Sequence, residues 1–305
     1  MADVLQGVSL IFVLIAAGYI AARCGVVGSS DRLVLNRVSF YVATPALMYT
    51  VLQRADGAAL LSPVILVIAV SALLCAGLLT LASLRWFRRS WIETALTATA
   101  AGYVNANALG LPIAIHVLHN GALAAALALL QMVAAAPAIL AMLESDRGDR
   151  AGRRSVLGRI AANPVVIASV AGVIASSLSL RTPAVILEPL NVLGESAIPM
   201  ILISFGASLH GQRLPGTGGN LAPVLLASTL KLLFMPCVAW LLSIALRLSP
   251  EQMLAAVTLA ALPTAQNLYT YAATYQRAEA VVRDVVVLTT LGTLPVILIV
   301  QWLLA

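Results

Sequence analysis

Few residues of this sequence can do chemistry, and two of them are ionisable side chains inside long apolar runs. Glu195 lies in the run from 188 to 209, and Lys231 lies in the run from 221 to 246. A charge at bilayer depth costs about 2.5–3.5 kcal/mol on insertion scales, so both residues are functional candidates. Their roles stay open: Glu195 as a proton carrier, Lys231 as a substrate counter-ion or coupling group, a structural ion pair between them, or snorkelling to the interface.

Amides and prolines interrupt two further apolar runs. The stretch NANALGLP, residues 105 to 112, lies in the run from 94 to 118, and LPTAQN ends at Asn267 in the run from 253 to 275. Pro112 and Pro263 each remove a backbone donor, so we expect both to break their helices and free the carbonyl four residues back. Freed groups persist in lipid only when they are buried in protein or line a cavity. Each break exposes a half-helix N-terminus, and this predicts an anion site.

The amides of Asn105 and Asn267 have two readings. They can satisfy the freed backbone groups, or they can bind ligand oxygens, and their residue type allows both roles. Since amides do not titrate near neutral pH, neither residue can carry a coupling proton.

No catalytic, metal or nucleotide constellation accompanies these residues. Cys24, Cys75 and Cys237 are isolated, without the spacing of a zinc site or a disulfide framework. HExxH, GxSxG and phosphate-loop motifs do not occur. We therefore expect no enzyme, no metal, no cofactor and no ATP-driven transport.

The composition places the chain among multi-pass membrane proteins. Of its 305 residues, 61% are hydrophobic and 10% are charged, and the mean hydropathy is +0.99. A helix of roughly 20 residues crosses about 30 Å of hydrocarbon. Runs of about that length occur at 4–22, 34–53, 62–84, 94–118, 122–143, 161–180, 188–209, 221–246, 253–275 and 283–304. The predicted class is an all-α polytopic membrane protein with ten transmembrane helices.

Arginines set the predicted orientation in the bilayer. The connections alternate in charge: fourteen arginines fall on one side, against Arg54, Arg181 and Arg247 on the other. The positive-inside rule places the fourteen in the cytoplasm and both termini on the non-cytoplasmic side, in a bacterial cytoplasmic membrane. The basic residues lie in short connections between apolar runs, so the net charge of +6 does not indicate a nucleic-acid partner.

The longest polar segment divides the chain into two halves of five runs each. An odd number of spans per half requires the second half to be inverted, as in inverted-repeat transporters. The predicted organisation is a first repeat over 1–143, a cytoplasmic basic loop over 144–160 and an inverted repeat over 161–305. The second and seventh runs also match, through helix breaks at Pro45 and Pro199.

The same motifs carry a family resemblance. NANALGLP, LPTAQN, VLTTLGTLP in the tenth run, the Asn163–Pro164 pair and the contexts of Pro45 and Pro199 resemble the auxin efflux carrier family. This family includes plant PIN carriers and bacterial malonate-transporter-like members. The short central loop is similar to that of the bacterial members.

The resemblance implies a fold of the sodium/proton antiporter and bile-acid symporter type, in which broken helices 4 and 9 cross. Helices 1, 2, 6 and 7 would form a scaffold, and helices 3–5 and 8–10 would form a moving transport domain. The carboxylate of an organic anion would bind near the crossing. The candidate substrate-binding residues are Asn105, Gly110, Pro112, Pro263, Thr264, Gln266 and Asn267.

The expected function is secondary transport of a small mono- or dicarboxylate such as malonate, by elevator-type alternating access. A proton or sodium gradient, or the membrane potential acting on the anion, would drive it. Two alternatives stay open: a ligand-binding membrane sensor on a transporter fold, and a sodium-coupled symporter of larger amphipathic acids. The expected partners are the anion, a proton or sodium ion, the lipid bilayer and a second copy of the chain.

Overall fold

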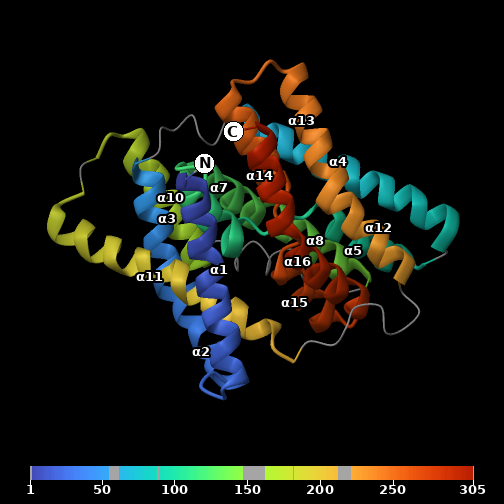
Figure 1. Cartoon of the computed structure of the whole chain (residues 1–305), viewed down its shortest axis with the longest axis horizontal. Helices are drawn as coiled ribbons and strands as arrows, with labels where there is room; N and C mark the ends of the chain where they lie inside the picture. Colours follow the sequence, from blue (N-terminus) through green and yellow to red (C-terminus); the bar gives the residue numbers. More distant parts are fainter. Residues whose placement is uncertain are drawn as a thin grey trace. The chain divides into compact units, whose positions relative to one another are not determined.

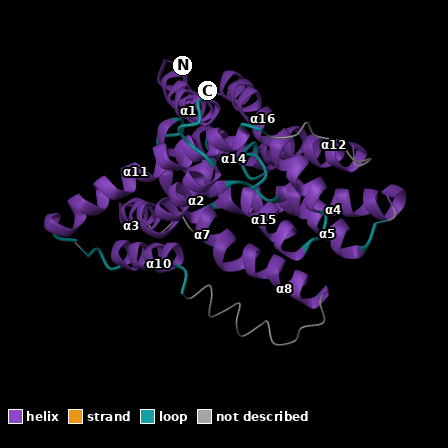
Figure 2. Ribbon diagram, turned by 90° about the horizontal axis from the view of Figure 1, so that it is seen from below, coloured by secondary structure: helices purple, strands orange, loops and turns teal. Residues whose placement is uncertain are grey.

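Helices account for nearly all of the regular structure (Figure 1). The computed structural model describes residues 2–54, 62–87, 89–146, 162–180, 182–211 and 221–304. Within these ranges the predicted apolar runs are mostly helical, and the β-structure is one isolated bridge (Figure 2). The predicted loop 144–160 lies outside the described residues beyond Asp146.

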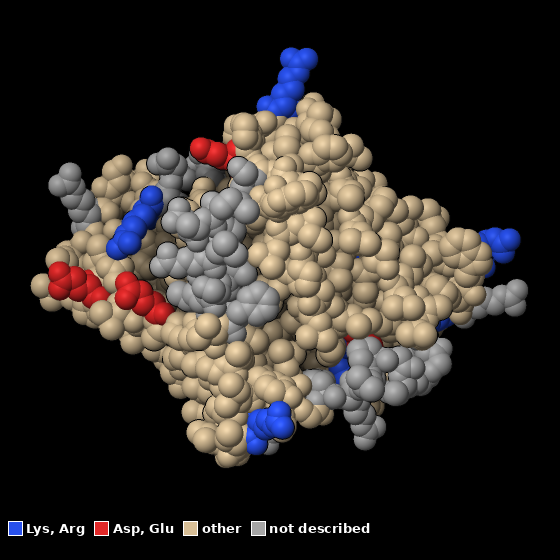
Figure 3. Space-filling model, in the orientation of Figure 1, with Lys and Arg blue, Asp and Glu red and all other residues tan. Residues whose placement is uncertain are grey.

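Several helical segments are suited to a bilayer. Figure 3 shows few charged side chains among the described residues on the face in view. Five described segments are long and apolar enough to cross a membrane: Pro63–Phe87, Gly121–Leu143, Ala184–Leu209, Leu221–Ala245 and Glu279–Leu304. The protein is therefore a multi-pass membrane protein.

The chain packs into two compact units, and each draws on both halves of the sequence. The first unit comprises Met1–Leu61, Asn107–Pro137 and Arg153–Gln212. The second comprises Ser62–Ala106, Ala138–Gly152 and Arg213–Ala305. Segments distant in the sequence thus build each unit together.

The first unit contains two long helix pairs held by backbone-to-backbone contact. Its elements are α1 (Ala2–Arg23), α2 (Ser29–Val38), η1 (Ser39–Ala43), α3 (Thr44–Arg54), α6 (Leu111–His116), α7 (Gly121–Leu130), η5 (Gln131–Ala135), α10 (Pro164–Ser177) and α11 (Ala184–Leu209). α1 packs on α11, and α3 packs on α10 (Figure 1). At these contacts Gly18 faces the backbone of Ile203, and Gly172 faces the backbone of Tyr49. A side chain on either glycine would overlap that backbone, so glycine sets the close approach.

The two glycine contacts occupy equivalent positions along their helices. Two residues after the ends of α1 and α10, Gly25 (φ 75°) and Ser179 (φ 51°) adopt the left-handed conformation, each seven residues after its contact glycine. The backbones that the glycines face each lie four residues after a proline, Pro45 in α3 and Pro199 in α11. The α1–α11 and α10–α3 contacts are thus related position by position.

The second unit contains the whole of the second interrupted segment, 253–275, and the first part of the other one, up to Ala106. Its elements are α4 (Pro63–Ala82), η3 (Ser83–Phe87), α5 (Trp91–Gly102), most of α8 (Ala136–Asp146), α12 (Leu221–Thr229), η6 (Leu230–Phe234), α13 (Met235–Ala245), α14 (Pro250–Ala260), α15 (Gln266–Tyr275) and α16 (Glu279–Leu304). Capping boxes start α5, through Ser90 and Glu93, and α14, through Ser249 and Gln252. Such caps satisfy the first amides of a helix and define where it begins.

Four prolines in apolar segments are accommodated by π-helical turns. In η1 the amide of Thr44 donates to the carbonyl of Ser39, five residues back, and Pro45 follows. The same arrangement, a π-turn followed two residues later by proline, recurs at η4 (Ala106–Gly110), η5 and η6. A π-turn re-pairs backbone groups that proline would otherwise strand in lipid, so these helices continue through their prolines.

Candidate functional site

Two helical segments are interrupted by extended residues. α5 ends at Gly102 and helix resumes at Ala106, and α14 ends at Ala260 while α15 begins at Gln266. Pro263 lies in the second break. The predicted break at Pro112 is wrong in position, because Pro112 is the second residue of α6 in a segment that is helical from Ala106 to His116. The π-turn of η4 precedes Pro112 and re-pairs the backbone groups that this proline would otherwise leave unpaired, so the helix continues through it.

The two breaks pair with each other through one antiparallel bridge between Val104 and Thr264. On one side the Asn105 N–H donates to the carbonyl of Pro263 at 2.8 Å. On the other side the Ala265 N–H donates to the carbonyl of the residue before Val104 at 3.1 Å. Each break thereby supplies the partners that the other lacks, which lipid could not.

Threonine side chains make further hydrogen bonds to backbone groups at the second break. The Thr264 hydroxyl donates to the carbonyl of Ala100 at 2.7 Å, and the Thr264 N–H donates to the hydroxyl of Thr289 at 3.1 Å. The Thr293 hydroxyl donates to the carbonyl of Ala261 at 3.2 Å. Thr264 was a candidate substrate ligand, but its hydroxyl is engaged with α5 backbone. Its contacts give it a structural role in the bridge.

Lys231 caps the end of α14. Its side chain is completely buried, and its ammonium donates to the carbonyl of Ala260 at 2.8 Å and to the sulfur of Met235 at 3.0 Å. Ala260 is the last residue of α14, where the helix dipole presents its negative end. Glu195 is an exposed residue of α11 in the first unit. A coupling role for either residue, or a pair between them, stays a prediction.

Asn267 sits between two phenols at the start of α15. It is the second residue of that helix, and its side-chain amide donates to the hydroxyl of Tyr103 at 3.1 Å. Tyr271, one turn later on the same face, also interacts with the Asn267 side chain. Gln266 begins the helix. The first amides of a helix lack intrahelical acceptors, so neutral donors gather here.

Sequence reasoning named Asn267 but missed both tyrosines. Tyr103 lies two residues before the stretch NANALGLP, and Tyr271 follows Asn267 at the helical spacing of four residues. That spacing could have indicated Tyr271. The Tyr103 contact depends on the bridge between distant segments, for which the sequence carries no direct signal.

The bridge register also singles out Asn107. It lies three residues after Val104, as Asn267 lies three residues after Thr264. Its side-chain oxygen is buried without a hydrogen-bond partner in the part of the chain that the structure describes. The side chain of Asn105 is 4% exposed, and Gly110 is buried at the end of η4. Asn107 is therefore a candidate that the sequence did not distinguish.

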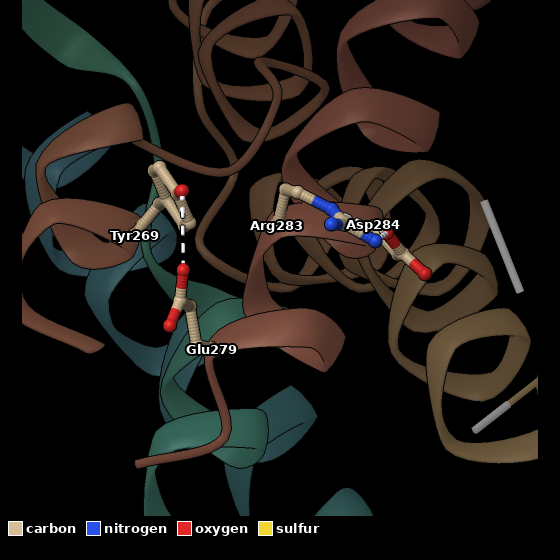
Figure 4. Close-up of polar contacts among 4 residues, drawn as sticks. All are labelled: Tyr269, Glu279, Arg283 and Asp284. Carbon is tan, nitrogen blue, oxygen red and sulfur yellow. Dashed lines mark hydrogen bonds and ion pairs between the residues drawn. The ribbon is translucent and has the colours of Figure 1, made fainter. Parts of the chain in front are cut away.

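A second polar cluster lies at the start of α16 (Figure 4). Arg283 pairs with Asp284 at 2.7 Å, and the hydroxyl of Tyr269 donates to Glu279 at 3.4 Å. Asp284 is only 3% exposed and lies in the tenth apolar run, so it is a third ionisable residue within these runs beside Glu195 and Lys231. It was missed because it lies at the first turns of the tenth run.

This cluster adjoins an open cavity of about 500 Å³. Arg89, Ser90 and Glu93 line it from the start of α5, and Glu279 lines it from the start of α16. The described residues contain no group of three or more His, Cys, Asp or Glu side chains placed to hold a metal ion.

Apolar spanning helices with two paired interruptions define this protein as a membrane protein with polar structure built inside its bilayer segments. The class is that of membrane transporters. Residues 3–301 match the family described as "Membrane transport protein", and the chain belongs to this family, which confirms the resemblance to auxin efflux carriers.

Two relatives carry transporter names. A Methanothermobacter thermautotrophicus protein named "Uncharacterized transporter" is 29% identical over 236 residues, covering 75% of this chain and 74% of the relative. A Rhizobium meliloti protein named "Putative malonate transporter" is 28% identical over 297 residues, covering 92% and 91%. These names indicate a transporter rather than an enzyme.

Proposed function

We propose that this protein is a secondary transporter of small organic anions, a mono- or dicarboxylate of the malonate type, in a bacterial cytoplasmic membrane. The observation that carries the proposal is the Val104–Thr264 bridge, which joins the two interrupted segments and places the first turn of α15 beside α5. Family membership and the name of the Rhizobium meliloti relative support the substrate class.

The first turn of α15 supplies the chemistry of the proposed site. The positive end of its helix dipole stabilises a nearby anion by about 0.3–2 kcal/mol, depending on burial. Asn267 adds a side-chain amide there, and Gln266 contributes from the first position. Asn105, Gly110, Pro112 and Pro263 keep their candidate roles, whereas Thr264 acts through the bridge.

We further propose the ten-helix inverted-repeat architecture with both termini outside. The position-by-position relation of the α1–α11 and α10–α3 contacts supports it. So does the bridge, in which residues on both sides exchange backbone hydrogen bonds in the same register. In the proposed elevator cycle, the first, second, sixth and seventh of the ten predicted transmembrane helices are the scaffold. The crossing moves with the third to fifth and the eighth to tenth of these transmembrane helices.

The test is charge movement by the purified protein on a solid-supported membrane. Concentration jumps of malonate, other carboxylates and indole-3-acetate, each with and without a proton or sodium gradient, report substrate and coupling. Asn267→Ala should abolish the current, and Asn120→Ala should keep it, because Asn120 is exposed and its side chain makes no capping bond to α7.

Each outcome decides between specific alternatives. Carboxylate currents lost in Asn267→Ala but not in Asn120→Ala support the site. Binding without current and without tracer flux would assign a sensor instead. If no carboxylate binds to the wild-type protein, the organic-anion proposal is refuted.

A further inference from the structure

Tyr103 is hydrogen-bonded to the segment around the second break through both its backbone and its side chain. Its carbonyl accepts the Ala265 N–H at 3.1 Å, and its hydroxyl accepts the Asn267 side-chain amide at 3.1 Å. The residue is 7% exposed, whereas Asn267 is exposed. The phenol is thus a buried, oriented group beneath an accessible amide.

The Tyr103 hydroxyl still has a proton to donate. A tyrosine hydroxyl has one proton to donate and can also accept. Because Asn267 supplies the hydrogen in their shared bond, the proton of Tyr103 is left for another acceptor. The adjoining Tyr271 hydroxyl interacts with the same amide. The cluster therefore presents donors to whatever lies at the first turn of α15.

The charge of the cluster limits the class of ligand. Tyr103, Asn267 and Tyr271 are neutral, and the buried Lys231 side chain donates to the Ala260 carbonyl. Neutral donors arranged around a helix N-terminus match a group that carries a negative charge and offers several hydrogen-bond acceptor positions, as a carboxylate does. A carboxamide or an ester presents fewer acceptor positions, and a carboxamide also brings donors that find no partner.

We propose that Tyr103 is a specificity-determining residue of the transporter: it orients Asn267 and donates its hydroxyl proton to a carboxylate oxygen of the substrate. This inference rests on the proposed organic-anion function and deepens it. It assigns recognition of the carboxylate to neutral donors and not to an ion pair.

The first test is Tyr103→Phe, which keeps the ring and deletes the hydroxyl. Losing a hydrogen bond to a charged acceptor should raise the Kd for malonate about 10- to 100-fold. The maximum current at saturating malonate should change much less, since the group acts in binding. The Kd for dimethyl malonate, which has no carboxylate to accept the Tyr103 proton, should rise less than that for malonate.

Tyr49→Phe is the matched control. It removes a phenol hydroxyl that lies in the first unit, where its bond is to Thr182 at 2.6 Å. The Kd for malonate should stay at the wild-type value. An equal rise in both variants would mean a general loss of packing and would overturn the specificity role.

A second variant keeps the hydroxyl and changes its acidity. Difluorotyrosine incorporated at position 103 is a stronger donor at neutral pH, so malonate should bind more tightly than to wild type. Binding should weaken as the pH rises and the more acidic phenol ionises. This variant retains the shape of tyrosine, so it reports even if Tyr103→Phe fails to fold.

The outcomes separate this inference from the function on which it rests. If wild type transports malonate, and Tyr103→Phe and the fluorinated protein bind it with unchanged Kd at all pH values, the role of Tyr103 is refuted and the transport function stands. If the wild-type protein neither binds nor transports any carboxylate, both are refuted.

Discussion

Thr264→Val tests whether the threonine of the bridge serves the backbone or the substrate. Valine has nearly the same shape and removes only the hydroxyl. In the structure that hydroxyl donates to the Ala100 carbonyl at 2.7 Å, and Thr264 is completely buried. We therefore expect a loss of stability with no change in the Kd for malonate.

The magnitude follows from the burial of the acceptor. Ala100 lies in the last turn of α5, where carbonyls lack the full set of helical donors, and it is completely buried. Leaving a buried carbonyl without this bond costs about 1–3 kcal/mol. At about 2–4 °C per kcal/mol, the unfolding midpoint should fall by about 2–12 °C.

Thr97→Val is the matched control. Thr97 is a buried threonine of the same α5 helix, and its hydroxyl donates to the Glu93 carbonyl four residues back at 2.7 Å. That carbonyl is at the position where the helix itself supplies a backbone amide, so it keeps a partner after the substitution. The midpoint should change by less than half as much.

A thiol-reactive dye provides the assay. Cys75 is buried, whereas Cys24 and Cys237 are exposed, so a background with Cys24→Ser and Cys237→Ser reports unfolding through Cys75 alone. An unfolding midpoint equal to that of the background, together with a weaker Kd for malonate, would refute the structural role and return Thr264 to the substrate site.

Three further predictions concern helix packing at Gly18, the buried Lys231 and the side chain of Asn107. Gly18→Ala should lower the unfolding midpoint, because its Cβ would overlap the Ile203 backbone. In the control Gly77→Ala the new Cβ meets open space, so the free energy of unfolding should rise by about 0.5–1 kcal/mol. Equal effects of the two substitutions would contradict the close helix contact. Lys231→Ala should lower the free energy of unfolding by about 2–5 kcal/mol through a cavity and an unpaired Ala260 carbonyl, and Lys231→Met should cost less because it keeps most of the side-chain volume; the same dye assay checks the order. Asn107→Ala should raise the apparent KM for malonate without lowering the midpoint, and an unchanged KM would remove Asn107 from the site.

The apolar pattern was sufficient to predict where the helices lie. Long runs of apolar residues in a membrane chain must be helical, because the bilayer offers no partner for an unpaired backbone group. The second break was also readable, since Pro263 lies within it. The position of the first break was not readable from its proline. η4 absorbs Pro112, and the chain extends instead at residues 103 to 105.

For the candidate site, the sequence indicated individual residues but not their hydrogen-bond partners. Asn267 was readable as an amide in the first turn after a break, and Lys231 as a charge in an apolar run. Their partners were not, because a hydrogen bond between Asn267 and Tyr103 joins residues 164 apart in the chain. The hydrogen bond of the Thr264 hydroxyl was not readable for the same reason, since its acceptor belongs to α5.

The sequence by itself determined that this is a helical membrane protein, which side its arginines favour, and which two segments cannot be plain helices. These properties follow from local composition and from the constraint that lipid imposes on every backbone group. Tertiary structure alone decided which carbonyl Lys231 contacts, which phenol holds Asn267, and that Val104 pairs with Thr264. Such choices depend on the register in which distant segments meet, and register is set by the packing of the whole unit and not by any one stretch of residues.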